Sequence, residues 1–164
     1  MIKFKVSDIP IGESEETLTL GKDEVDLGSY EFSGGELHLH FDREDDTIRI
    51  FFTIKTELTL ICDRSLEPFS FLVDEDYEVI YRLDGEEFTD DVEVTVKPLA
   101  SHDNVIQIDQ EVRDTILLAI PAKKLHPKFL DEQGEPTDFQ VTFGEETIDP
   151  RWEPLKSLKK NSNK

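Results

Sequence analysis

The strongest constraint on the fold is a period-two alternation over residues 47–62. Even positions from 48 to 62 are apolar apart from Thr56, and odd positions are polar apart from Phe51 and Ile61. Successive side chains of a β-strand point to opposite faces, so this run predicts one long strand, or two strands joined by a bulge. The even face is predicted to be buried, and Cys62 continues it.

Shorter alternations on both sides of this run predict further strands. They lie at residues 2–6, 18–20, 37–41, 69–73, 77–83, 92–96 and 139–143. The sequences "DREDD" at 42–46 and "LDGEE" at 83–87 are turn signals, and "SGGEL" at 33–37 predicts a turn before a strand. The pattern therefore predicts a mainly antiparallel sheet.

Two segments have helical signals. In "IDQEVRDTILLAIP", residues 108–121, apolar side chains follow helical spacing, Asp109 suits the N-cap and Pro121 ends the run. In "DPRWEPLKSLKK", residues 149–160, a short helix is predicted from Pro154, because proline suits the first helical position. The predicted fold is α+β and mainly β. It has a curved antiparallel or barrel-like sheet, a central helix and a short C-terminal helix.

The charge is strongly asymmetric along the chain. The formal net charge is −20, and residues 151–164 carry +4, which leaves −24 for residues 1–150. Phosphate backbones are bound mainly by Lys and Arg, so an acidic body disfavours broad nucleic-acid contact. The split favours a basic protein partner, or RNA contact confined to the C-terminal end; alternatively, the acidity serves only solubility. We predict one acidic domain over 1–158 and a basic mobile tail over 159–164.

The same composition argues against membrane insertion and secretion. No apolar stretch approaches the roughly 18–20 residues of a membrane span, and "MIKFKVSDIP" lacks the pattern of a signal peptide. A single cysteine excludes an internal disulfide, which suits a reducing cytoplasm. We expect a cytoplasmic protein that contacts no membrane.

Residue types that carry chemistry are few. Cys62 could join His38, His40, His102 or His126 in a metal site, but a solvated strand face explains His38 and His40 equally well. A buried thiol is usually inert, which argues against a nucleophile at Cys62. There is no Gly-rich phosphate loop and no nucleophile elbow. We therefore predict no catalytic residue, metal, cofactor or small-molecule substrate.

Basic and aromatic residues give the candidate binding contacts. Arg64 follows Cys62 beside a proline turn, where it could pair with the acidic body or face a partner. In the C-terminal segment, Trp152 and Leu155 are predicted to dock the short helix and to leave its lysines outside. The candidate contact residues are Arg64, Arg151, Trp152, Lys156, Lys159 and Lys160.

Three motifs in this order resemble a known family. They are "CDRSLEPF" at 62–69, "IDQEVRDTILLAIP" at 108–121 and "DPRWEPLKSLKK" at 149–160. Together they resemble the YceD family, the large ribosomal RNA subunit accumulation proteins. In that family a Cys-x-Arg-Cys-Leu segment follows a long strand, an Ile-Asp segment leads into a helix ending in Leu-Pro or Ile-Pro, and the chain closes with Asp-Pro-Arg and a Leu-rich basic end. The first sixty residues match only in their strand pattern.

The resemblance implies a cytoplasmic role in accumulation of the large-subunit (23S) ribosomal RNA, without an enzymatic reaction. The implied partner is a ribosomal protein, an assembly factor or the precursor RNA. Two other functions stay open: a general acidic interaction module unrelated to ribosomes, and a metal- or thiol-dependent enzyme.

The chain departs from the family pattern at its cysteines. Many members have a second cysteine where Ser65 stands, and further cysteines after the Ile-Pro segment, where this chain offers only His126. Cys62 plus His126 is two ligands short of a structural zinc site. We therefore expect packing, instead of a metal, to hold this segment.

Overall fold

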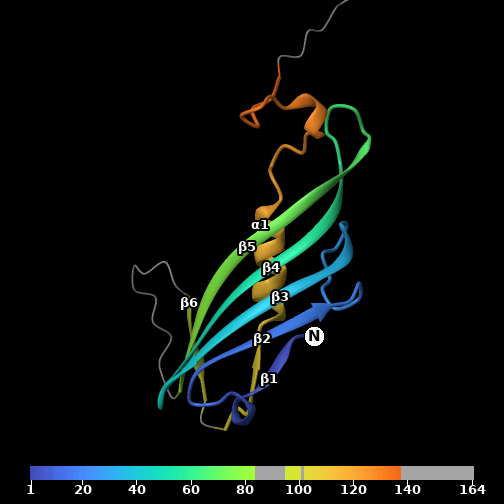
Figure 1. Cartoon of the computed structure of the whole chain (residues 1–164). Coiled ribbons are helices and arrows are strands. Elements are labelled where there is room, and N and C mark those ends of the chain that lie inside the picture. Colours follow the sequence, from blue (N-terminus) through green and yellow to red (C-terminus); the bar gives the residue numbers. More distant parts are fainter. Residues whose placement is uncertain (84–94, 101, 138–164) are drawn as a thin grey trace, which may run out of the picture.

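The computed structural model describes residues 1–83, 95–100 and 102–137, which form a mainly β structure (Figure 1). In chain order the strands are β1 (Lys3–Lys5), β2 (Gly12–Leu20), β3 (Glu31–Arg43), β4 (Thr47–Ile61), β5 (Pro68–Leu83), β6 (Thr95–Leu99) and β7 (Val105–Gln107). The α-helix α1 spans Asp109–Ala119, and short 3-10 turns cover Val6–Asp8 and Pro127–Phe129. The predicted C-terminal helix, the strand at 139–143 and the tail lie outside the described residues.

The larger sheet has the order β2-β3-β4-β5-β6, and β1 pairs with β7 in a separate two-stranded sheet. Neighbours from β2 to β5 are antiparallel, whereas β6 runs parallel to β5. The expectation of a curved antiparallel or barrel-like sheet is therefore confirmed only in part: most of the sheet is antiparallel, but β6 makes it mixed, and within the described residues it does not close into a barrel and has β2 and β6 at its edges. Its strands twist strongly along their length (Figure 1). Side-chain alternation reports which face is buried but carries no information on strand direction, so it could not reveal the parallel pair.

The hairpin of β4 and β5 confirms the burial that the alternation predicted. The even positions of β4 from 48 to 60 are buried, and Cys62 is buried directly after them. The strands predicted at 69–73 and 77–83 are one continuous strand, β5, which pairs with β4 along its whole length. Burial of this single apolar face sets the register, because a slip of one residue would turn every core side chain to solvent.

The segment predicted as a turn at 33–37 is a bulge inside β3, where the register with β4 shifts between Phe32 and Gly35. Gly34 has φ +101°, which favours glycine. Its carbonyl accepts a hydrogen bond of 2.7 Å from the hydroxyl of Thr56. The bulge therefore explains why a threonine can occupy the buried face of β4.

Helix α1 lies against the buried face of the sheet (Figure 1). Val112 and Ile116 are buried there, as their spacing predicted. The N-cap is Ile108 and not Asp109, because the buried side chain of Ile108 continues the inward pattern of β7 directly into the helix. The helix ends at Ala119, before Pro121 as predicted. Within the described residues, no helix is long and apolar enough to cross a membrane.

Candidate functional site

The turn after β4 packs against the segment that follows α1 (Figure 1). We call residues 62–67 and 122–130 the Cys62 lobe. The N–H of Asp63 donates to the carbonyl of Lys124 at 2.7 Å, and the N–H of Lys124 donates to the Asp63 carboxylate at 2.7 Å. One of these bonds joins two backbone groups and the other is accepted by a side chain, and together they hold two segments that are distant in sequence.

The thiol of Cys62 is the acceptor at the centre of this lobe. Its sulfur accepts the N–H of Arg64 at 3.4 Å and the N–H of His126 at 3.3 Å. Burial raises the pKa of the thiol, but hydrogen bonding from the N–H of His126, from the side chain and N–H of Ser65 and from the N–H of Arg64 outweighs it and lowers the pKa to about 7. Cys62 therefore joins the β4–β5 turn to the segment after α1 through backbone donors.

The lowered pKa of Cys62 makes stability depend on pH. The pKa is about 7 in the folded chain and 9.0 ordinarily, so the folded state favours the thiolate. This contribution is complete above pH 9 and is lost as the pH falls towards 7. We expect the free energy of unfolding of the unaltered chain, minus that of Cys62→Ser, to rise from pH 7 to pH 9 in urea titrations. A difference that stays constant over this window would contradict the assignment.

Cys62 contacts His126 through the backbone N–H of that residue. The backbone N–H of His126 faces the sulfur, while its imidazole Nδ1 accepts the N–H of Lys128 at 3.1 Å. Across the part of the chain that the structure describes, no three His, Cys, Asp or Glu side chains gather to hold a metal ion. His38 lies 3.1 Å from the hydroxyl of Thr17 and His40 lies 3.7 Å from Glu15, contacts that suit a solvated strand face.

Arg64 is the one predicted contact residue that lies within the described residues. Its guanidinium stacks over the ring of Phe129, 4.9 Å from the centroid, and donates to the carbonyl of Thr137 at 3.2 Å. These contacts tie it to its own chain, and its role towards a partner stays a prediction. The other candidates lie outside the described residues: Arg151, Trp152, Lys156, Lys159 and Lys160.

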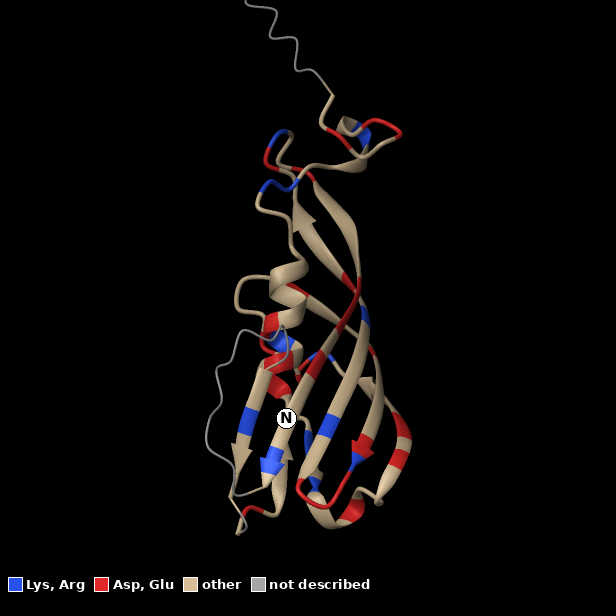
Figure 2. Ribbon diagram, turned by 90° about the vertical axis from the view of Figure 1, so that its left-hand side faces the viewer, with Lys and Arg blue, Asp and Glu red and all other residues tan. Residues whose placement is uncertain are grey.

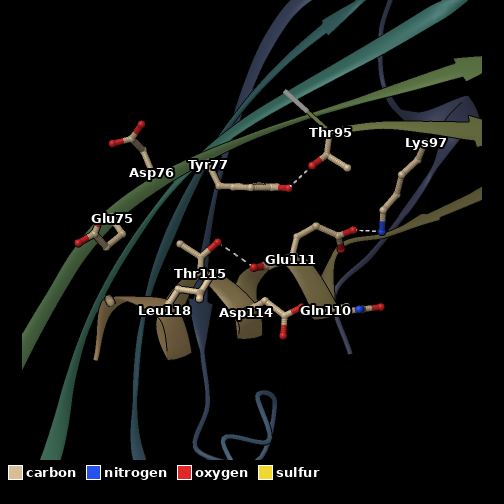
Figure 3. Close-up of a pocket in the computed structure, with 11 residues that line it drawn as sticks. Glu75, Asp76, Tyr77, Thr95, Lys97, Gln110, Glu111, Asp114, Thr115 and Leu118 are labelled. Carbon is tan, nitrogen blue, oxygen red and sulfur yellow. Dashed lines mark hydrogen bonds and ion pairs between the residues drawn. The ribbon is translucent and has the colours of Figure 1, made fainter. Parts of the chain in front are cut away.

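A second candidate site lies between α1, β5 and β6 (Figure 3). This cavity of about 510 Å³, which we call the α1 groove, is within the range of ligand pockets, roughly 300–1,000 Å³. Its main lining residues are Glu75 and Tyr77 from β5, Thr95 and Lys97 from β6, and Glu111, Asp114, Thr115 and Leu118 from α1. The residues from α1 share one face because they recur at helical spacing.

The side chain of Glu111 sits in the wall of the groove and is 5% exposed. One carboxylate oxygen forms an ion pair with Lys97, and the other has no hydrogen-bond partner within the described residues. Burial, followed by the negative charge of Glu111, raises the pKa of Tyr81 well above its usual range. The groove wall therefore holds a buried negative charge that Lys97 balances.

Sequence reasoning missed this groove, although one signal was present. The odd positions of β5 face the core and are apolar or aromatic from Phe69 to Leu83, with the single exception of Glu75. A charge at one inward position of a long strand indicates a place where the helix does not cover the sheet. The pairing of Lys97 with Glu111 left no such signal, because the two residues come from different elements.

One known protein family matches the larger part of this chain. The family described as "Large ribosomal RNA subunit accumulation protein YceD" matches residues 50–159, about two thirds of the sequence. The match includes most of β4, all of β5 and α1, and the Cys62 lobe. Searches of curated proteins and of solved structures gave no match. The chain belongs to the YceD family of large ribosomal RNA subunit accumulation proteins.

Proposed function

We propose that this chain is a non-enzymatic ribosome-biogenesis factor of the cytoplasm. It supports accumulation of the large-subunit (23S) ribosomal RNA by binding a basic ribosomal protein or assembly factor. The observation that carries this proposal is the family match over residues 50–159. The family description names an effect on RNA accumulation, and the binding step is the part that we add.

The charge of the body supports a protein as the partner. Asp and Glu lie along the strands, on α1 and in the loops between strands, with fewer Lys and Arg among them (Figure 2). A surface with this balance attracts cationic partners and repels phosphate. Ribosomal RNA contact is then expected at the C-terminal residues 151–164, which carry +4. Crosslinks to RNA that are confined to residues 1–100 would contradict that division.

The chemistry of the described residues supports binding in place of catalysis. The thiol of Cys62 is buried and accepts two backbone donors, so it is not presented to a substrate. In the α1 groove, the amino group of Lys97 and the carboxylate of Glu111 pair with each other. Ion pairs that are closed within the chain are typical of structural roles.

The proposal is tested by depletion of the protein and by sedimentation of lysate. We expect depletion to lower the amount of mature 23S RNA relative to 16S RNA, and we expect the protein to sediment with large-subunit precursors. If it never moves with these precursors and its loss leaves 23S RNA unchanged, the proposal fails. Pull-downs that recover only non-ribosomal partners would favour a general acidic interaction module instead.

A further inference from the structure

The helical wall of the α1 groove presents an uncovered apolar side chain. Leu118 is 85% exposed among the described residues, and it lies four residues after Asp114 and seven after Glu111 on the same helix face. Opposite Leu118, the ring of Tyr77 packs on that of Phe52, with 5.8 Å between the ring centroids. The hydroxyl of Tyr77 lies 2.5 Å from the hydroxyl of Thr95. The groove therefore has an apolar wall on each side, one of them fixed by the sheet (Figure 3).

The rim of the groove is negatively charged. Glu75 is exposed on β5, and no Lys or Arg forms an ion pair with it in the described part of the chain. Asp114 has only a 3.6 Å contact with its sequence neighbour Arg113, and both side chains are almost half exposed. Exposed pairs of this kind contribute little, so both rim carboxylates remain available to a cation.

The charges of the described lining residues disfavour an anionic ligand. Lys97 is the only lysine or arginine among the described residues that line the groove, and Glu111 already pairs with it. A phosphate group would meet Glu75 and Asp114 with no cation to receive it. A positively charged group that carries an apolar portion suits this combination of walls and rim.

We propose that the α1 groove binds a lysine- or arginine-containing segment of a protein partner. The basic side chain lies between Glu75 and Asp114, and a neighbouring apolar side chain of the segment packs on Leu118 and Tyr77. The volume of about 510 Å³ accommodates side chains of one short segment. This inference deepens the proposed function, because it names the surface on which the acidic body holds a basic ribosomal component.

The test measures binding of a short fluorescein-labelled peptide of Lys, Leu and Ala to the full chain by fluorescence anisotropy. A peptide with Glu at every Lys position is the probe control. We expect Glu75→Lys to weaken binding of the basic peptide by at least about tenfold, since like charges then meet at the rim. Glu13→Lys is the matched variant: it makes the same charge change at an exposed position of β2, which lies at the other edge of the sheet and does not line the groove. We expect it to weaken binding less than about threefold.

The apolar part of the site has its own matched pair. Leu118→Ser removes the exposed leucine of the groove, and Leu72→Ser removes a leucine that is 74% exposed on the opposite face of β5. We expect about a tenfold loss of affinity for the first variant and no loss for the second. If both variants of either pair lost the same affinity, binding would depend only on the total charge of the chain or on non-specific hydrophobic contact. That result would overturn the proposal.

Two further experiments are needed. Peptide binding by a shortened chain shows whether the chain's own C-terminal end occupies the groove, and sedimentation with large-subunit precursors separates this inference from the proposed function. If only a chain shortened to residue 150 binds the peptide, the chain's own basic end occupies the groove and the inference fails. If Glu75→Lys loses the peptide but the unaltered chain never sediments with large-subunit precursors, the groove stands and the ribosomal function fails. If precursor binding persists while no variant changes peptide binding, the function stands and the groove assignment fails.

Discussion

Replacing Gly35 with alanine is expected to lower the free energy of unfolding by about 3 kcal/mol or more, at the upper end of the overpacking range. An added Cβ would lie 2.6 Å from the carbonyl oxygen of Lys55 and 2.9 Å from the Cβ of Thr56. The carbonyl is part of the paired backbone of β4, so it cannot turn away as a flexible side chain would. The thermal midpoint should fall by roughly 6–12 °C, since each kcal/mol shifts a domain of this size by about 2–4 °C.

The control for this substitution is Gly21→Ala. An added Cβ at Gly21 would make an ordinary contact of 3.7 Å with the side chain of Glu24. We expect a change within about 0.5 kcal/mol, which is usual for surface substitutions. Thermal melts followed by circular dichroism compare the two variants. Similar midpoints for both would show that the bulge in β3 can relax and that the close approach to β4 does not constrain the fold.

The bulge shows where sequence reasoning on the fold reaches its limit. The alternation in β4 predicted its length and its buried face, because period two maps directly onto the two faces of a strand. The glycines at 34 and 35 were equally visible, yet a turn and a bulge both call for glycine. Only the register with β4 decides between them. The same holds for β6, whose parallel pairing with β5 depends on a contact distant in sequence.

The candidate sites, like the fold, could be predicted from the sequence only in part. The burial of Cys62 followed from the register of β4, but its N–H donor from His126 comes from a segment 64 residues later. In the α1 groove, the inward position of Glu75 could be read from the alternation of β5. The exposure of Leu118 could not, because helical spacing alone does not show how far a helix overlaps the sheet. Local patterns thus predict faces, whereas sites arise where faces of distant segments meet.

The second large effect is expected at the ion pair between Lys97 and Glu111. Lys97→Met leaves the carboxylate of Glu111 buried without its cation. Breaking a buried pair from one side costs about 3–5 kcal/mol, but Lys97 is 37% exposed and water can replace part of its charge. We therefore expect a loss of about 2 kcal/mol in urea unfolding. The matched control is Lys55→Met, whose partner Asp74 and own side chain are both more than half exposed, and it should cost less than about 1 kcal/mol.

A double-mutant cycle separates the charge from the packing of the lysine stem. If the cost of Lys97→Met comes from the unpaired carboxylate, adding Glu111→Gln should restore part of the lost stability, because a neutral amide is far less costly to bury than a carboxylate. If the cost comes from packing, the second substitution should restore nothing. A double variant that is no more stable than Lys97→Met would contradict the claim that Lys97 balances the buried charge of Glu111. Recovery would establish that Lys97 is committed to Glu111 and stabilises its buried carboxylate.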